Sequence, residues 1–269
     1  TANTKLDTGP ATHFIEYGSK HGYTLRVKSN ILSIRPELCG LPPVTPCRRV
    51  VRRLLKGLCQ FLVWLCTYIE VHGLENFPKQ GPVLIVINHL GDADAFLGLA
   101  CAPVCIDTIA KQELYDIPII GALMHAYVII WLQRGVAYRH VLRAALDGLT
   151  EGRFVSIAPE GRESLTGALE EGTDGAAYLA LKLDALILPV TFTGTENRRI
   201  FGNLKHLRRT AVTVTIGEPF RLENNGDRRK DVAQGTLTIM RTLARQLPSE
   251  YRGVYQTTSP LLPSEKHRQ

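Results

Sequence analysis

The sequence predicts an α/β fold in which helices flank a largely parallel central sheet. Short apolar runs rich in β-branched residues alternate with longer segments that have the period of amphipathic helices. Several of these runs end in polar or charged residues, as expected where parallel strands end at a ligand site. The chain has 269 residues, 45% hydrophobic and 21% charged, so it can bury a core and does not belong to the disordered class.

Strands and helices are expected to alternate from residue 83 onward. The expected strands are 83–88, 104–109, 127–132, 154–158, 186–193 and 211–217. The expected helices are 94–101, 112–125, 138–150, 173–183 and 229–246. We therefore expect one α/β domain at 73–250, followed by a C-terminal tail at 251–269.

The first 72 residues have a different character. Residues 1–47 are expected to be an irregular extension, because glycine and proline interrupt every pattern, and no segment there resembles a secretory signal. Residues 48–72 are expected to form a basic and apolar helical segment associated with a membrane. Its apolar part, 58–69, is shorter than the roughly 20 residues that span a bilayer, so we expect it to lie in the interface. A core helix with a basic start and a tilted span remain alternatives.

The most informative motif follows the apolar run at 83–87. Asn88 and His89 end that run, and Asp92 and Asp94 follow. On a continuous helix Asp94 would lie about 140° around from His89, so a pair between them requires His89 to precede the helix. A carboxylate on one imidazole nitrogen fixes the tautomer and makes the other nitrogen a base. From these residues alone, the alternative that His89 ends a strand and the aspartates cap a helix stays open.

Four motifs in order resemble the glycerolipid acyltransferases of the 1-acyl-sn-glycerol-3-phosphate (lysophosphatidate) type, over roughly residues 73–222. They are the histidine, four residues, aspartate block at 89–94, the strand ending in Arg134, the segment 159–164, and the apolar run with proline at 187–190. The sequence departs from the family pattern at two places. Downstream of the third motif, residues 170–175 include acidic residues where relatives often carry a lysine, and the other departure is in the third motif itself. Arg162 stands where threonine is commonest in the family, and Glu163 stands where arginine is expected.

The resemblance implies roles for seven residues. His89 would remove the proton from the acceptor hydroxyl, and Asp94 would orient the imidazole. Arg134 and Arg162 would bind the phosphate of the acceptor. The remaining residues assigned to the acceptor site are Glu160, Gly161 and Ser164.

The sequence thus predicts an O-acyltransferase of phospholipid biosynthesis, at the cytoplasmic face of a membrane, that uses acyl-CoA or acyl carrier protein as co-substrate and no cofactor. The first candidate acceptor is 1-acyl-sn-glycerol-3-phosphate, giving phosphatidate. Alternatives are another lysolipid or an amino-acid lipid as acceptor, a thioesterase, or a non-catalytic lipid-binding protein. The net charge of +7 favours an anionic lipid surface. Nucleic acid is not expected, because no aromatic ladder accompanies the arginines. No metal is expected, because the six cysteines lack paired spacing.

Overall fold

The computed structural model describes residues 13–18, 24–29, 38, 40–132 and 138–257, and the chain divides into two units, Thr1–Leu38 and Cys39–Gln269. In the first unit, strands β1 (His13–Gly18) and β2 (Thr24–Ser29) pair antiparallel. The expectation of an irregular extension was therefore wrong for these twelve residues. β1 contains Phe14, Ile15 and Tyr17, and in β2 Leu25 and Val27 alternate with Arg26 and Lys28. Aromatic and β-branched residues of this kind are enriched in strands.

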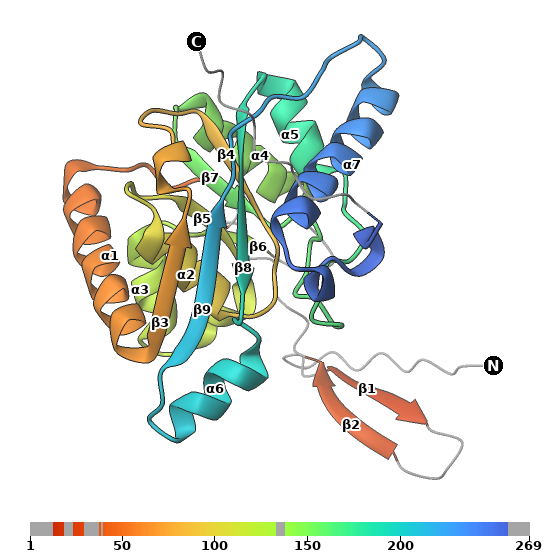
Figure 1. Cartoon of the computed structure of the whole chain (residues 1–269). Coiled ribbons are helices and arrows are strands. Elements are labelled where there is room, and N and C mark those ends of the chain that lie inside the picture. The colour runs from red at the N-terminus through yellow and green to blue at the C-terminus, as the bar shows by residue number, and fades with distance from the viewer. Residues whose placement is uncertain (1–12, 19–23, 30–37, 39, 133–137, 258–269) are drawn as a thin grey trace. The chain divides into compact units, whose positions relative to one another are not determined.

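Seven strands of the second unit form one sheet in the order β3-β9-β8-β4-β7-β5-β6 (Figure 1). Their bounds are β3 Thr67–His72, β4 Val83–Ile87, β5 Asp107–Lys111, β6 Ile130–Leu132, β7 Phe154–Ile157, β8 Leu186–Thr193 and β9 Thr210–Ile216. Neighbouring strands are parallel except β8 and β9, so β3 and β9 run opposite to the other five. The predicted α/β fold with a largely parallel sheet is confirmed.

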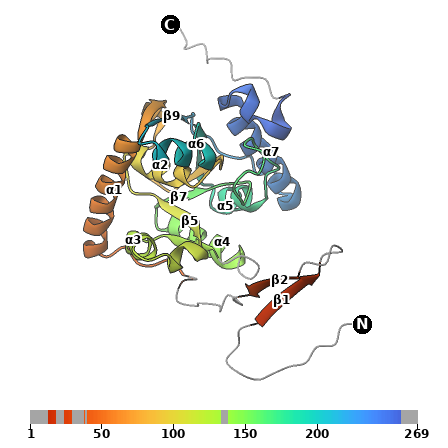
Figure 2. The same ribbon diagram turned by 90° about the horizontal axis from the view of Figure 1, so that it is seen from below.

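Helices cover both faces of this sheet (Figure 2). Their bounds are α1 Pro46–Cys66, α2 Ala93–Cys101, α3 Ile120–Tyr127, α4 Tyr138–Thr150, α5 Gly175–Leu183, α6 Asn197–Lys205 and α7 Arg228–Gln246. Side chains alternate along β4, so Leu84 and Val86 join the core under α4, α5 and α7, whereas Val83, Ile85 and Ile87 join the core under α2. Burial on both faces explains why β4 reads as an uninterrupted apolar run.

Three expectations from the sequence require correction. The segment 48–72 is helical only to Cys66, because 67–72 form β3 and pair with β9, more than 140 positions later in the chain. The expected helix 112–125 is divided into a 3₁₀ helix, Gln112–Asp116, and α3, since Pro118 cannot continue a helix. Helix α6 was not expected, because its many basic residues obscured the apolar spacing of its sequence.

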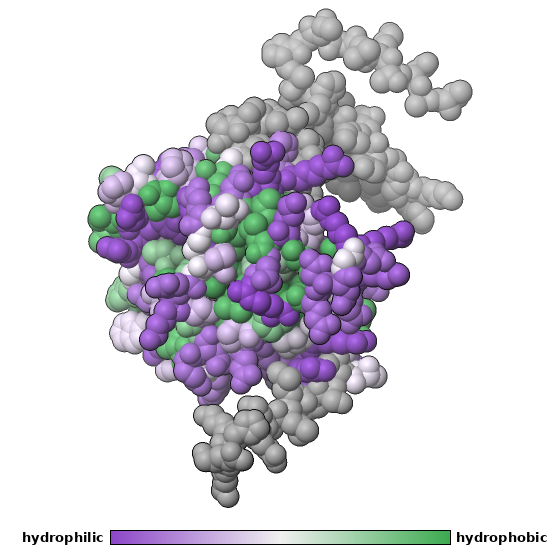
Figure 3. All heavy atoms as spheres, turned by 90° about the horizontal axis from the view of Figure 1, so that it is seen from above, coloured by the Kyte–Doolittle hydropathy of each residue, from purple (hydrophilic) through white to green (hydrophobic). Residues whose placement is uncertain are grey.

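Among the described residues, no helix combines the length and apolar character needed to cross a bilayer. Seen from the end of the domain opposite α6 (Figure 3), hydrophilic side chains form most of the outline, and hydrophobic ones gather in the middle.

Candidate active site

The carboxyl end of β4 positions the predicted histidine. Asn88, directly after the strand, is buried and spans to β8: its Nδ2 donates to Phe192 O at 2.9 Å, and its Oδ1 accepts from Phe192 N at 2.7 Å. These two hydrogen bonds fix the point at which the chain leaves the sheet. His89 consequently lies at the edge formed by the carboxyl ends of β4, β7 and β8, which we call the catalytic edge.

The structure brings His89 and Asp94 together. Nδ1 of His89 lies 3.0 Å from Oδ2 of Asp94, and the same oxygen accepts hydrogen bonds from Leu90 N at 2.7 Å and Gly91 N at 2.9 Å. The Asp94 side chain is 0% exposed and the His89 side chain is 21% exposed. Because Nδ1 is occupied by the carboxylate, Nε2 is the ring nitrogen left to exchange a proton.

The turn between β4 and α2 makes this pairing possible. Helix α2 begins at Ala93, so His89 precedes the helix, as the spacing requires. At Gly91 the chain passes so close to β8 that an added Cβ would lie 2.6 Å from Thr195 O. Glycine at this position therefore allows a close approach that a side chain would prevent.

Two opposing effects act on the pKa of His89. Burial lowers this pKa, while the hydrogen bond and charge of Asp94 raise it, and the net direction is upward. The imidazolium that forms when the ring takes a proton is therefore stabilised. This is the property expected of a general base that must hold a proton for part of a reaction.

Glu160 supports the histidine from the β7 side. Its Oε1 accepts a hydrogen bond from His89 N at 3.1 Å, and its Oε2 accepts one from Glu170 N at 2.9 Å. Burial raises the pKa of Glu160 to about 7, although both backbone N–H groups act in the other direction. Ser164 N donates to His89 O at 2.8 Å, so the loop after β7 holds both backbone polar groups of His89.

The other predicted acceptor-site residues have different surroundings. Gly161 has φ +74°, and an added Cβ would make only an ordinary van der Waals contact with Thr173 at 3.5 Å, so glycine is required here for the backbone conformation rather than for space. Ser164 Oγ donates to Ala168 O at 2.6 Å. The Arg162 guanidinium donates from Nε and Nη2 to Glu170 Oε2 at 3.0 and 2.6 Å. Arg134 lies outside the described residues.

The structure adds polar neighbours that were given no role from the sequence. Glu163 Oε1 accepts from Asn197 Nδ2 at 2.8 Å, and Asn197 Oδ1 accepts from Asp92 N at 2.9 Å. Glu163 Oε2 lies 3.9 Å from Lys111 Nζ. These residues are separated by up to 105 positions in the chain, so no local spacing could have paired them.

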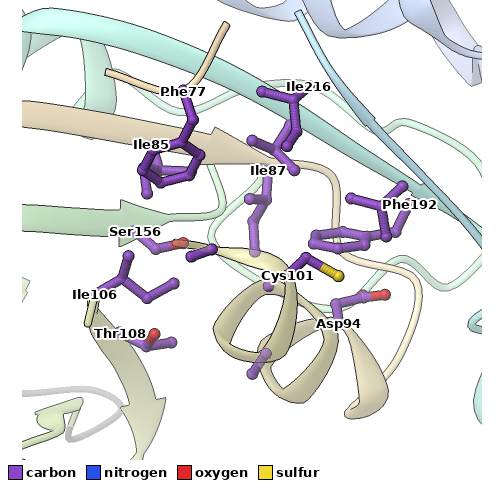
Figure 4. Close-up of a pocket in the computed structure, with 15 residues that line it drawn as sticks. Phe77, Ile85, Ile87, Asp94, Cys101, Ile106, Thr108, Ser156, Phe192 and Ile216 are labelled. Atoms are coloured by element: carbon purple, nitrogen blue, oxygen red, sulfur yellow. The ribbon is translucent and has the colours of Figure 1, made fainter. Parts of the chain in front are cut away.

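Asp94 also borders an internal apolar cavity of about 20 Å³ between α2 and the sheet, large enough for about one water molecule. Figure 4 shows its carboxylate at the margin of this cavity, near Phe192. Oδ1 of Asp94 has no hydrogen-bond partner among the described residues. An apolar surrounding of this kind strengthens the electrostatic interaction with His89. No group of three potential metal ligands occurs in the described part of the chain.

Comparison with known proteins shows which family the chain resembles. The family model Acyltransferase matches residues 68–193. The chain is 29% identical over 148 residues to the 1-acyl-sn-glycerol-3-phosphate acyltransferase of Borreliella burgdorferi, covering 54% of this chain and 59% of the relative. The chain therefore resembles the glycerolipid acyltransferases over this region. The chain is also 30% identical over 154 residues to the chloroplastic LPAT1 of Arabidopsis thaliana, covering 56% of this chain and 43% of the relative.

A solved structure shares the fold of this chain. The crystal structure of the 1-acyl-sn-glycerophosphate (LPA) acyltransferase PlsC from Thermotoga maritima aligns with a TM-score of 0.56 at 20% identity, over 79% of this chain and 84% of that one. The chain spans about half the length of the curated relatives described above. The matched residues 68–193 run from β3 to the end of β8, so they contain His89, Asp94 and Glu160, while α1 precedes them.

Proposed function

We propose that this acyltransferase transfers a fatty acyl group from an acyl thioester to the free hydroxyl of a lysophospholipid. The observation that carries the proposal is the pair of His89 with the buried carboxylate of Asp94, 3.0 Å apart, at the catalytic edge. The printed names of the relatives favour 1-acyl-sn-glycerol-3-phosphate as acceptor and phosphatidate as product. Acyl-CoA and acyl carrier protein are the two candidate donors.

In the proposed reaction, Nε2 of His89 takes the proton of the acceptor hydroxyl as the oxygen attacks the thioester carbonyl. Asp94 stabilises the imidazolium, as the carboxylate does in other histidine-carboxylate pairs. Collapse of the tetrahedral intermediate breaks the carbon-sulfur bond, and His89 returns the proton to the departing thiolate. No acyl-enzyme is required. Ser164 is not placed as a nucleophile, because its hydroxyl donates to Ala168 O within its own loop.

The acceptor phosphate is proposed to bind Arg162 together with Arg134. Guanidinium groups match phosphate oxygens well, but the Arg162 guanidinium is hydrogen-bonded to the Glu170 carboxylate. The acceptor phosphate would therefore replace Glu170 as the partner of Arg162. Glu160, Gly161 and Ser164 are proposed to shape the same site, the first and last of them through the backbone of His89.

Helix α1 is proposed to bind an anionic lipid surface at the cytoplasmic face of a membrane. Its apolar residues at spacings of three and four form one exposed stripe: Val50, Leu54, Leu58, Phe61 and Leu65. Its opposite side contacts the domain through polar groups, since Arg52 binds Asp107 and Lys56 Nζ donates to Val104 O. Folding therefore does not account for the apolar stripe, whereas insertion at a membrane interface does.

Replacement of the proposed base tests the function. With acyl-CoA and lysophosphatidate, we expect His89→Ala to lower turnover at least about a hundredfold, the lower range for loss of a general base. Thiol release and phosphatidate formation are both followed, the latter by mass spectrometry. The control is His72→Ala, because His72 ends β3 with a side chain that is 53% exposed. A near-normal rate in His89→Ala would remove His89 as the base.

The same assay separates the alternatives. Thiol release without a lipid product would indicate a thioesterase. Turnover with other lysolipids or amino-acid lipids but not with lysophosphatidate would assign a different acceptor. Vesicle binding without any turnover would indicate a lipid-binding protein.

A second test concerns the acceptor phosphate. We expect Arg162→Ala to raise the KM for lysophosphatidate about tenfold, within the range of charge-assisted hydrogen bonds, with a smaller effect on kcat. Arg221→Ala is a matched control, because Arg162 and Arg221 have side chains 57% and 51% exposed and each pairs with a carboxylate. An equal KM in wild type and Arg162→Ala would exclude Arg162 from the acceptor site.

A further inference from the structure

Exposed apolar side chains gather at the catalytic edge from several elements. Phe96 lies in the first turn of α2, seven residues after His89, and is exposed. Leu165 directly follows Ser164, whose N–H binds His89 O, and is also exposed. Neither residue is buried in either core.

The topology brings the end of α1 to the same edge. Strand β3 follows α1 without a break and runs opposite to β4 and β8. Its first residue, Thr67, pairs with Thr210 at the start of β9, and Thr213 of β9 pairs with Thr193 at the end of β8. The last turns of α1, with exposed Trp64 and Leu65, therefore lie beside the ends of the strands that hold the site.

The segment before α3 lies there as well. Strand β5 runs parallel to β7 and ends at Lys111, close to Glu163, and the 3₁₀ helix leads directly from it into this segment. Residues 117–120 of the segment are all exposed, and Ile119 and Ile120 are 75% and 44% exposed. Helix α3 packs against α1 (Figure 2), so these residues continue the apolar surface of α1.

The backbone at Ile119 is strained. Its φ of +69° and ψ of −57°, with the bond from Ile120 N to Pro118 O at 2.8 Å, define a classic γ-turn, which is rare and strained. Positive φ is particularly unfavourable for a β-branched residue. Burial within the described fold therefore does not explain an isoleucine at this position.

We propose that the turn at Ile119 and Ile120 is a second membrane-inserting element, which with Phe96 and the end of α1 holds the catalytic edge against the bilayer. The proposal rests on the proposed function, because a lysolipid acceptor lies in a membrane. A phospholipid bilayer is the occupant favoured by the observations, since the turn continues the apolar stripe of α1 and exposed Arg49 and Arg53 flank that stripe. Apolar insertion beside basic residues is the pattern of interfacial binding.

The test measures partition of the full chain into vesicles of phosphatidylcholine and phosphatidylglycerol by flotation. We expect Ile120→Asp to lower the partition coefficient about tenfold, because burial of one large aliphatic side chain is lost. An aspartate fits the first turn of a helix, so α3 should still form. Leu74→Asp is the matched control: Leu74 is 49% exposed but follows the end of β3, at the opposite edge of the sheet, and its replacement should leave partition unchanged.

A second variant separates insertion from folding. Ile119→Gly removes both the apolar group and the strain, so we expect weaker partition with an equal or higher midpoint of thermal unfolding. A lowered midpoint in Ile119→Gly would show that the side chain packs within the fold and would overturn the proposal. Unchanged partition in Ile120→Asp, or an equal loss in Leu74→Asp, would also overturn it.

Neither partition nor unfolding requires turnover, so these results are independent of the assay with His89→Ala. Light scattering without vesicles tests the other occupant, a second copy of this chain. A dimer that becomes monomeric in Ile120→Asp would assign the turn to that copy and reject the bilayer.

Discussion

At the residue scale, one carboxylate oxygen of Asp94 makes three polar contacts. Oδ2 accepts from the backbone of Leu90 and Gly91 and contacts Nδ1 of His89. The two backbone bonds fix the carboxylate before any substrate arrives, so the imidazole is oriented without reorganisation. The geometry of the pair thus depends on a turn of only six residues, so the local spacing permitted the pair and the motif resemblance favoured it over helix capping.

Loss of the Asp94 charge should change both rate and pH dependence. Asp94 raises the pKa of His89, and a base must be unprotonated to act, so the acid limb of kcat/KM lies at a higher pH with Asp94 than without it. We expect Asp94→Asn to move this limb to lower pH and to reduce kcat at least about a hundredfold. A pH profile of kcat/KM measures both. If the acid limb of Asp94→Asn lay at the same pH as that of the wild type, Asp94 would not control the pKa of His89.

The sequence was less informative about neighbours from distant segments. The motif resemblance named Glu160, but its bond to His89 N joins residues 71 positions apart. Glu163 attracted notice only as a departure from the family pattern. Its partner Asn197 lies on α6, a helix that was not expected, so the contact could not be foreseen.

At the element scale, a buried ion pair joins α1 to the sheet. Arg52 Nη2 lies 2.6 Å from Asp107 Oδ1 on β5, and both side chains are nearly inaccessible. Arg153 Nη1 approaches the other oxygen of Asp107 at 3.3 Å. The guanidinium of Arg52 also lies over the Tyr127 ring at the end of α3. These contacts make α1 part of the domain.

Breaking this pair should destabilise the fold. Arg52→Met leaves the Asp107 charge buried with Arg153 alone, and we expect a loss of about 3 kcal/mol in the free energy of unfolding, the lower range for a broken buried pair. The adjacent Arg53→Met, at an exposed position of the same helix, should change it by less than about 0.5 kcal/mol. Urea unfolding compares the two. Equal effects would show that the buried pair is not a main attachment of α1.

The elements differ in how far the sequence could predict them. Strand β4 and helix α4 were found nearly at their observed bounds, because their apolar patterns are strong and local. Strand β3 was assigned to a helical segment, since its residues Thr67–His72 continue the apolar run of α1 and only pairing with β9 defines them as a strand. Tertiary pairing overrides local pattern in such cases.

At the scale of the whole molecule, the net charge of +7 and the exposed apolar stripe of α1 would both act on the proposed partner, an anionic membrane surface. Each basic residue near an anionic membrane surface contributes about 1 kcal/mol, and salt screens this attraction. The apolar contribution is not screened. Charge thus favours approach to the membrane, and apolar insertion favours retention.

Binding to vesicles should therefore respond to salt only in part. We expect added NaCl to weaken flotation with vesicles that contain phosphatidylglycerol, to leave a measurable residual, and to have little effect with phosphatidylcholine alone. Flotation across a salt series measures this. Complete release from both kinds of vesicle at high salt would leave the apolar stripe of α1 without a role in binding.

The reversed direction of β3 and β9 has a consequence for how substrate is supplied. It fixes the last turn of α1 and the imidazole of His89 to the same border of one rigid sheet, with no flexible linker between them. A protein bound to a membrane through α1, as we propose, could not turn His89 away from the lipid without leaving the surface. Lysolipid would then arrive by lateral diffusion within the leaflet, and turnover would follow its surface density rather than its total amount in the sample.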